Sequence, residues 1–79
     1  MTGLICGQQQ VLTQNVIYAL PPMRVLLFTD ATTPTIEQST TPTFTANVAV
    51  SLTNGQAELA GGYIQCTSGN INAFLKKIE

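Results

Sequence analysis

Residues 54–78, NGQAELAGGYIQCTSGNINAFLKKI, decide the fold class that this sequence predicts. The stretch opens on Asn54-Gly55, the dipeptide that gives the strongest short-range signal for a two-residue β-hairpin turn. Ser68-Gly69-Asn70 is a second hairpin signal. Between and after these turns, apolar and polar residues alternate with the two-residue period of a half-buried strand. The stretch therefore predicts three consecutive antiparallel strands.

Each of the three predicted strands has one apolar face. Gly61-Gly62 separates the first two and allows a sharp bend or a bulge. Phe74 lies on the outer side of the last strand, opposite the apolar residues of its inner side. The strands are expected over residues 56–59, 63–67 and 71–78, with inner faces formed by Ala57 and Leu59, by Ile64 and Cys66, and by Ile71, Ala73 and Leu75.

Further strands are predicted upstream of this stretch, and the strongest of them is MRVLLFT at residues 23–29. Val25 and Leu27 point to one side of it, and Leu26 and Phe28 to the other. Two apolar faces indicate burial between layers or contact with another subunit. The other upstream strands are expected over residues 11–20, 35–39 and 44–53, and in the last of these Val48, Val50 and Leu52 share one face.

About seven short strands separated by turns are typical of a small antiparallel β-sandwich or barrel, so the predicted fold class is all-β. The chain has 79 residues, which is enough for one small domain. We expect residues 1–10 to form an N-terminal arm or an irregular first strand. Residues 11–79 are expected to form a single β domain.

The charge content is low. Three basic and four acidic residues make up 9% of the chain, against about 25% in a typical soluble domain. The only basic cluster, Lys76-Lys77, is next to Glu79, which argues against a nucleic-acid partner. No run approaches the roughly 20 apolar residues of a membrane span, and residues 1–10 do not resemble a signal peptide. We expect neither a nucleic-acid nor a membrane partner. We expect the protein to be synthesised in the cytoplasm.

The chemical inventory argues against an enzyme. The sequence has no histidine, and its two cysteines, Cys6 and Cys66, are too few for a structural zinc site. A disulfide between them and a buried, reduced Cys66 are the two alternatives for these thiols. Glu37 and Glu58 are expected on solvated strand faces, and no glycine-rich motif fits phosphate. We predict no catalytic residue, no cofactor and no metal.

A domain of this size gains barely enough from apolar burial to offset its ordering entropy, so association with other chains is expected. Apolar side chains that cannot all point inward are candidates for that contact. The candidate interface residues are Leu4, Ile5, Tyr18, Arg24, Leu26, Phe28, Phe44, Tyr63 and Phe74.

Two segments resemble the small structural proteins of tailed bacteriophages, the decoration or cement proteins of the capsid. They are ALPPMRVLLFTDATTPTIEQS, residues 19–39, and LAGGYIQCTSGNINAFLKKI, residues 59–78. The similarity lies in a Thr- and Ala-rich, weakly charged β pattern that ends in a glycine-hinged hairpin and a basic pair. No functional residue of the family transfers, because no invariant motif is matched.

The resemblance implies a non-enzymatic virion protein that binds the major capsid protein and stabilises the shell, as a trimer or another homo-oligomer. A tail, collar or fibre-associated subunit is an alternative within the same class. A small carbohydrate-binding β module is an alternative from another class. Such modules usually display Trp or Tyr platforms, and this chain has no Trp and two Tyr residues, Tyr18 and Tyr63.

Overall fold

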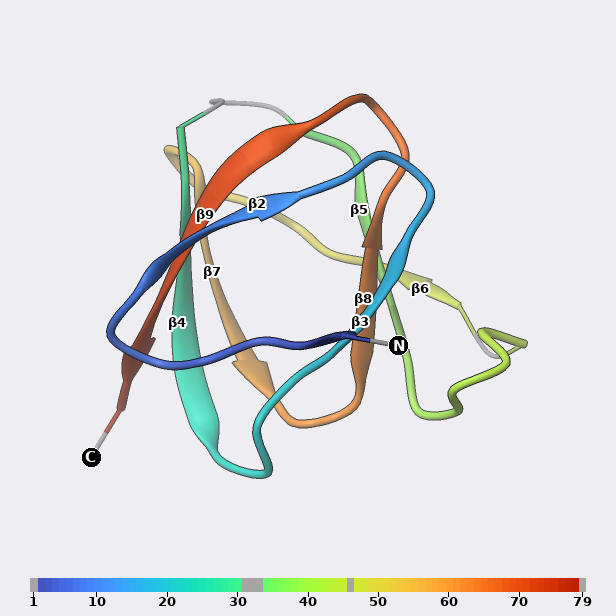
Figure 1. The fold of residues 1–79 in the computed structure, drawn as a ribbon, viewed down its shortest axis with the longest axis horizontal. Coiled ribbons are helices and arrows are strands. Elements are labelled where there is room, and N and C mark those ends of the chain that lie inside the picture. The colour runs from blue at the N-terminus through green and yellow to red at the C-terminus, as the bar shows by residue number, and fades with distance from the viewer. Residues whose placement is uncertain (1, 31–33, 46, 79) are drawn as a thin grey trace.

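The computed structural model describes residues 2–30, 34–45 and 47–78, and this part of the chain is all-β. Within these residues, nine short strands form two sheets that face each other across the core (Figure 1). The five-stranded sheet has the order β1 (Thr2–Gly3), β3 (Ile17–Ala19), β8 (Tyr63–Cys66), β5 (Ile36–Ser39) and β6 (Val48–Ala49). The four-stranded sheet has the order β2 (Gln9–Leu12), β9 (Ile71–Lys77), β4 (Arg24–Thr29) and β7 (Gln56–Ala60).

The predicted fold class, a small antiparallel β-sandwich or barrel, is confirmed. Every strand pair is antiparallel except that of β1 with β3, which is parallel. Within the described residues, no helix has the length and apolar character needed to cross a membrane.

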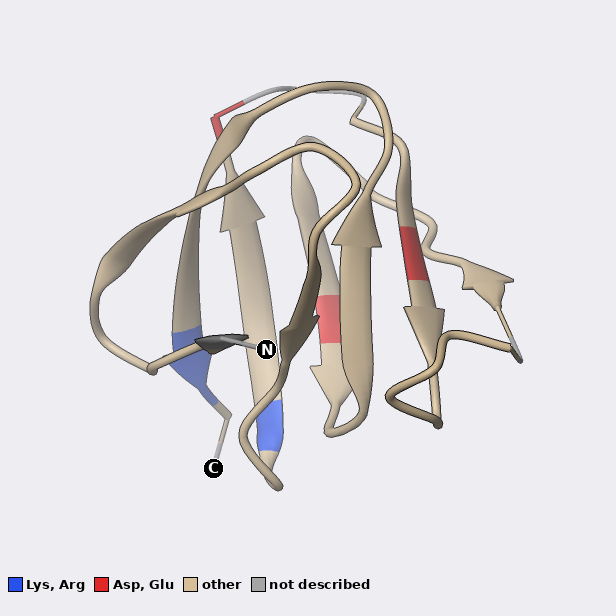
Figure 2. Ribbon diagram, turned by 45° about the vertical axis from the view of Figure 1, so that its right-hand side comes forward, with Lys and Arg blue, Asp and Glu red and all other residues tan. Residues whose placement is uncertain are grey.

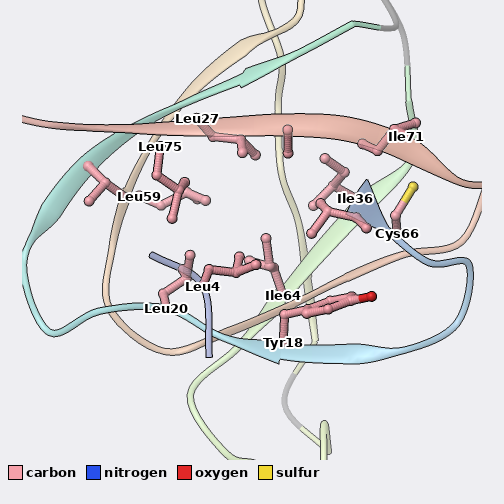
Figure 3. Packing of buried hydrophobic residues seen from close by; sticks show 13 residues of the cluster. Leu4, Tyr18, Leu20, Leu27, Ile36, Leu59, Ile64, Cys66, Ile71 and Leu75 are labelled. Atoms are coloured by element: carbon pink, nitrogen blue, oxygen red, sulfur yellow. The ribbon is translucent and has the colours of Figure 1, made fainter. Parts of the chain in front are cut away.

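The hydrophobic core fills the space between the sheets, and β4 and β9 supply its centre on one side (Figure 3). Val25 and Leu27 of β4 are fully buried, and they lie opposite Lys77 and Leu75 of β9 in the ladder. From the other sheet, Ile64 of β8 is also fully buried. The inner faces predicted for β7, β8 and β9 are confirmed, because all of their members are buried: Ala57, Leu59, Ile64, Cys66, Ile71, Ala73 and Leu75.

The prediction that the last three strands are consecutive neighbours is wrong. β7 and β9 belong to the four-stranded sheet, whereas β8 belongs to the five-stranded sheet. Ser68-Gly69-Asn70 is therefore a corner between sheets and not a hairpin turn. Asn54-Gly55 does form a tight turn, closed by the Thr53–Gln56 bridge, with φ angles of 53° and 74° that suit a type I′ turn.

The strand predicted over residues 11–20 is two strands in the structure. β2 pairs with β9 in one sheet, and β3 pairs with β8 in the other. Asn15 lies between them with φ 62°, a left-handed conformation that Asn adopts more readily than most residues. Its N–H donates to the Cys66 carbonyl at 2.8 Å, which fixes the corner. The sequence of residues 11–20 is β-prone throughout, and therefore it predicted one strand where the structure has a corner.

The strand predicted over residues 44–53 shrinks to the two residues of β6. Phe44 has φ 58°, which interrupts an extended chain. Val48 is 67% exposed, so the prediction that it shares one face with Val50 and Leu52 is wrong. Val50 and Leu52 do pack against the core, but outside any strand, where the chain crosses between the sheets.

The N-terminal segment lies along the sandwich. β1 pairs with β3, and the Leu4 side chain is 6% exposed and belongs to the core. The side-chain amide of Gln10 accepts a hydrogen bond from Ile5 N–H and donates one to Ile5 C=O, at 3.1 and 2.9 Å. The Gln10 side chain thereby forms the pair of hydrogen bonds that a neighbouring strand would otherwise form with Ile5.

The bend at Gly61-Gly62 carries the chain from β7 to β8, and both glycines have positive φ, 73° and 84°. A Cβ on Gly62 would lie 2.8 Å from the Ser39 carbonyl oxygen, whereas a Cβ on Gly61 would meet only atoms at 4.0 Å. Both positions therefore require glycine for their backbone conformation, but only Gly62 also requires it for space.

Three alanine substitutions separate these two effects. Gly61→Ala should lower the free energy of unfolding by about 1–2 kcal/mol, the cost of the left-handed conformation. Gly62→Ala should lose a further 1–3 kcal/mol or so, because the methyl group overlaps backbone. Gly3→Ala is the control, since a Cβ there has no atom within 4 Å. Urea unfolding measures all three, and equal losses at positions 61 and 62 would contradict the steric argument.

Candidate interaction surface

The outward side of the four-stranded sheet is the candidate functional surface, and we call it the outer face. Because alternate residues of β4, β7 and β9 are buried, the intervening side chains point away from the core. Strand register aligns these outward side chains in rows across the sheet. The outer face comprises Gln9, Val11, Arg24, Leu26, Phe28, Gln56, Glu58, Ala60, Asn72, Phe74 and Lys76.

An aromatic pair lies at the centre of the outer face. Phe28 and Phe74 are direct cross-strand partners, and their rings meet edge to face with centroids 6.4 Å apart. This is a favourable geometry for two aromatic rings. Phe74 remains 36% exposed and Phe28 is half-buried, so the pair is available to a partner. Leu26, half-buried, extends the apolar area toward the start of β4.

Charges border this apolar area. Arg24 and Glu58 form an ion pair in which Arg24 Nε lies 3.0 Å from Glu58 Oε1, with both side chains largely exposed. Lys76 shares a ladder row with Leu26 and Glu58. In Figure 2 the basic residues colour the start of β4 and the end of β9, and Asp30 lies beyond the opposite end of β4.

A shallow hollow of about 240 Å³ lies where the aromatic pair meets Asp30. The Asp30 carboxylate accepts two hydrogen bonds from Asn72, at 3.1 Å from the backbone N–H and at 2.9 Å from Nδ2. Asp30 N–H in turn donates to the Asn72 carbonyl at 3.2 Å. The carboxylate is therefore held in a fixed position. The hollow is lined by Gln9, Phe28, Thr29, Asp30, Asn72, Ala73 and Phe74.

The structure brings four of the predicted interface residues together on the outer face: Arg24, Leu26, Phe28 and Phe74. Leu4 and Tyr18 are corrections, because their side chains are 6% and 7% exposed and belong to the core. The Tyr18 hydroxyl accepts a hydrogen bond from Thr13 N–H at 2.9 Å. A buried Tyr18 offers no platform to a sugar ring.

The remaining predicted interface residues lie elsewhere. Ile5 is 56% exposed in the N-terminal segment, and Phe44 is half-buried in the connection between β5 and β6. Tyr63, half-buried, is in the five-stranded sheet, on the other layer of the sandwich.

Sequence reasoning missed the polar half of the surface. The sequence pattern does not reveal the pairing of β2 with β9 that brings Gln9 beside Phe74. Asn72 did carry a usable signal, because it is two residues before Phe74 and therefore shares its face.

The acidic residues are not arranged as a catalytic pair. Glu37 lies on the five-stranded sheet, opposite Gln65, and Glu58 lies on the four-stranded sheet, opposite Leu26. Their strands therefore place them on different layers of the sandwich, as Figure 2 shows. Among the described residues, no group of three or more His, Cys, Asp or Glu could hold a metal ion.

Comparison with models of known protein families, with curated proteins and with solved structures finds no match to this chain.

The two cysteines are free thiols in different environments. Cys66 is fully buried, with Sγ 3.2 Å from the Gly69 carbonyl oxygen. Cys6 is half-exposed, and its Sγ lies 3.9 Å from Met23 Sδ. Reaction with a water-soluble reagent requires access to the sulfur, so the two thiols should differ in rate.

Thiol titration with a water-soluble aromatic disulfide tests this difference. In the native protein Cys6 should react promptly, while Cys66 should react only as fast as the protein opens. Both should react at once in guanidinium. Cys6→Ser should abolish the fast phase and leave the slow one. Equal native rates would contradict the burial of Cys66, and no reaction in guanidinium would indicate the disulfide alternative.

Proposed function

We propose that this chain is a non-enzymatic virion structural protein that binds the major capsid protein and stabilises the shell. The observation that carries the proposal is the exposed aromatic pair, Phe28 and Phe74, at the centre of the outer face. The resemblance of residues 19–39 and 59–78 to capsid decoration proteins supports the choice of partner.

The physical case for a binding face starts from what exposed apolar side chains cost. A small domain has a limited number of large apolar residues, and placing them in the core would stabilise the fold. Here Phe28, Phe74 and Leu26 lie outside a core whose members are mostly aliphatic, with Tyr18 as its aromatic residue among those the structure describes. A grouped apolar patch on a soluble domain usually marks a contact with another macromolecule.

The low charge of the chain supports the same conclusion. With 9% charged residues, the surface has weak electrostatic protection against association. Aromatic residues at the centre and a polar or charged border are the usual arrangement of a protein–protein interface. On the outer face, the Arg24–Glu58 pair and Lys76 would form such a border.

Leu4 and Ile5 of the N-terminal segment are among the interface residues that the sequence predicts. Because Leu4 is part of the core, that segment is occupied within the sandwich, and the proposal does not include it. The face of the four-stranded sheet is the proposed contact, with bridging of neighbouring capsid subunits as its effect. Assembly into a homo-oligomer, such as a trimer, stays a prediction that light scattering can test.

Co-sedimentation with capsids that lack this protein tests both the partner and the face. The wild-type chain should co-sediment at micromolar concentration. The double variant Leu26→Thr/Phe74→Thr should bind about tenfold more weakly or worse, since truncating a central aromatic commonly costs more than 1 kcal/mol or so. Threonine keeps a high strand propensity at both positions.

The matched control is Val48→Thr, which changes an apolar residue that is 67% exposed on the other sheet. It should bind as the wild type does. Absence of wild-type binding would reject the capsid function. Wild-type binding with no loss in the double variant would reject the outer face while keeping the function.

A further inference from the structure

The hollow beside Phe74 contains a carboxylate that is fixed in position and has no cationic partner among the residues the structure describes. Both Asp30 oxygens accept hydrogen bonds from Asn72, which orients the group. The ion pair found in this part of the chain, Arg24–Glu58, involves neither Asp30 nor Asn72. A carboxylate oxygen has two lone pairs, so each Asp30 oxygen keeps capacity for another donor.

Two aromatic rings form part of the same hollow. Phe28 and Phe74 line it together with Asp30 and Gln9. Aromatic faces attract cations through their quadrupole, most often the guanidinium of arginine. A carboxylate and two aromatic rings around one concavity therefore share a preference for the same kind of group, which is a flat cation with several N–H donors.

The hollow is small and open to solvent. Its volume of about 240 Å³ is below the range of roughly 300–1,000 Å³ that is usual for small-molecule sites. A single long side chain is a better match to this volume than an extended ligand. The Gln9 side chain at the rim is exposed and can add a neutral hydrogen bond.

The charge distribution on the outer face favours a cation at this end. Arg24 begins β4, and Lys76 is near the end of β9, whereas Asp30 follows the opposite end of β4. Lys76 lies in the ladder row next to that of Phe74. The acidic Glu58 lies in the same row as Lys76. An incoming cation at Asp30 therefore approaches the end of the face that is remote from the chain's own Arg24.

We propose that this hollow accepts the guanidinium group of an arginine side chain presented by the partner protein. Asp30 would accept its N–H donors while Phe28 and Phe74 contact its apolar stem and its plane. Arginine is preferred to lysine because its planar group stacks on aromatic rings and is more weakly hydrated than an ammonium group. This inference rests on the proposed function, in that it specifies what the outer face recognises on its partner.

The test uses small probes and no capsid, so its outcome is separate from that of co-sedimentation. Nα-acetyl-arginine amide is titrated into the isotopically labelled protein, and the Kd is taken from the chemical shifts of the Asn72 backbone and side-chain amides. Nα-acetyl-citrulline amide has nearly the same shape without the charge. The arginine probe should bind about tenfold more tightly than the citrulline probe, from its ionic and aromatic contacts together.

Variants locate the effect. Asp30→Asn should remove the preference for arginine over citrulline, and Phe74→Leu should weaken arginine binding several-fold with no loss of fold. Glu37→Gln removes the same charge from the other sheet and should leave both affinities unchanged. If Asp30→Asn disturbs the fold, as seen from amide dispersion, Phe74→Leu decides the matter.

Three results would overturn the proposal. One is equal binding of the arginine and citrulline probes to the wild-type protein. Another is binding of Nα-acetyl-lysine amide as tight as that of the arginine probe. The last is an effect of Glu37→Gln as large as that of Asp30→Asn.

Discussion

The structure depends on the apolar contact that β4 and β9 make with the opposite sheet. These two strands lie side by side at the centre of the four-stranded sheet, and their inward residues, Val25, Leu27 and Leu75, are almost completely buried. Because a strand alternates its side chains, fixing this inner set also fixes the outer one. Phe28 and Phe74 face solvent as partners since Leu27 and Leu75 face inward as partners. The strand register of β4 and β9 thus determines both which side chains form the core and which form the candidate surface.

Local pattern predicted the strands well where alternation was strong. The buried sets of β7, β8 and β9 could be assigned from the sequence, because each has an apolar inner face and a polar or mixed outer face. Connections were harder to predict. Ser68-Gly69-Asn70 has the composition of a hairpin turn but joins two sheets, and Asn15 interrupts a continuous β-prone run. Turn composition indicates where the chain bends, but not toward which sheet it proceeds.

Strand alternation also explains why part of the candidate surface could be predicted. Leu26, Phe28 and Phe74 could be assigned to outward positions, because each alternates with a core residue on its own strand. Leu4 and Tyr18 were misassigned, since their burial depends on packing of the short strand β1 and of β3 over the core. The Asp30–Asn72 contact joins residues 42 positions apart in sequence. Only the pairing of β4 with β9 brings them together.

The central position of β9 in the four-stranded sheet affects how the chain reaches its native state. β2, at residues 9–12, pairs with residues 71–74 of β9. The four-stranded sheet therefore cannot close until its last strand has been synthesised, and the core between the sheets stays open until then. Topologies dominated by such distant pairings fold slowly for their size. During synthesis, β4 can pair with β7 before β9 is made, but its other edge stays unpaired until then, and an unpaired strand edge favours aggregation.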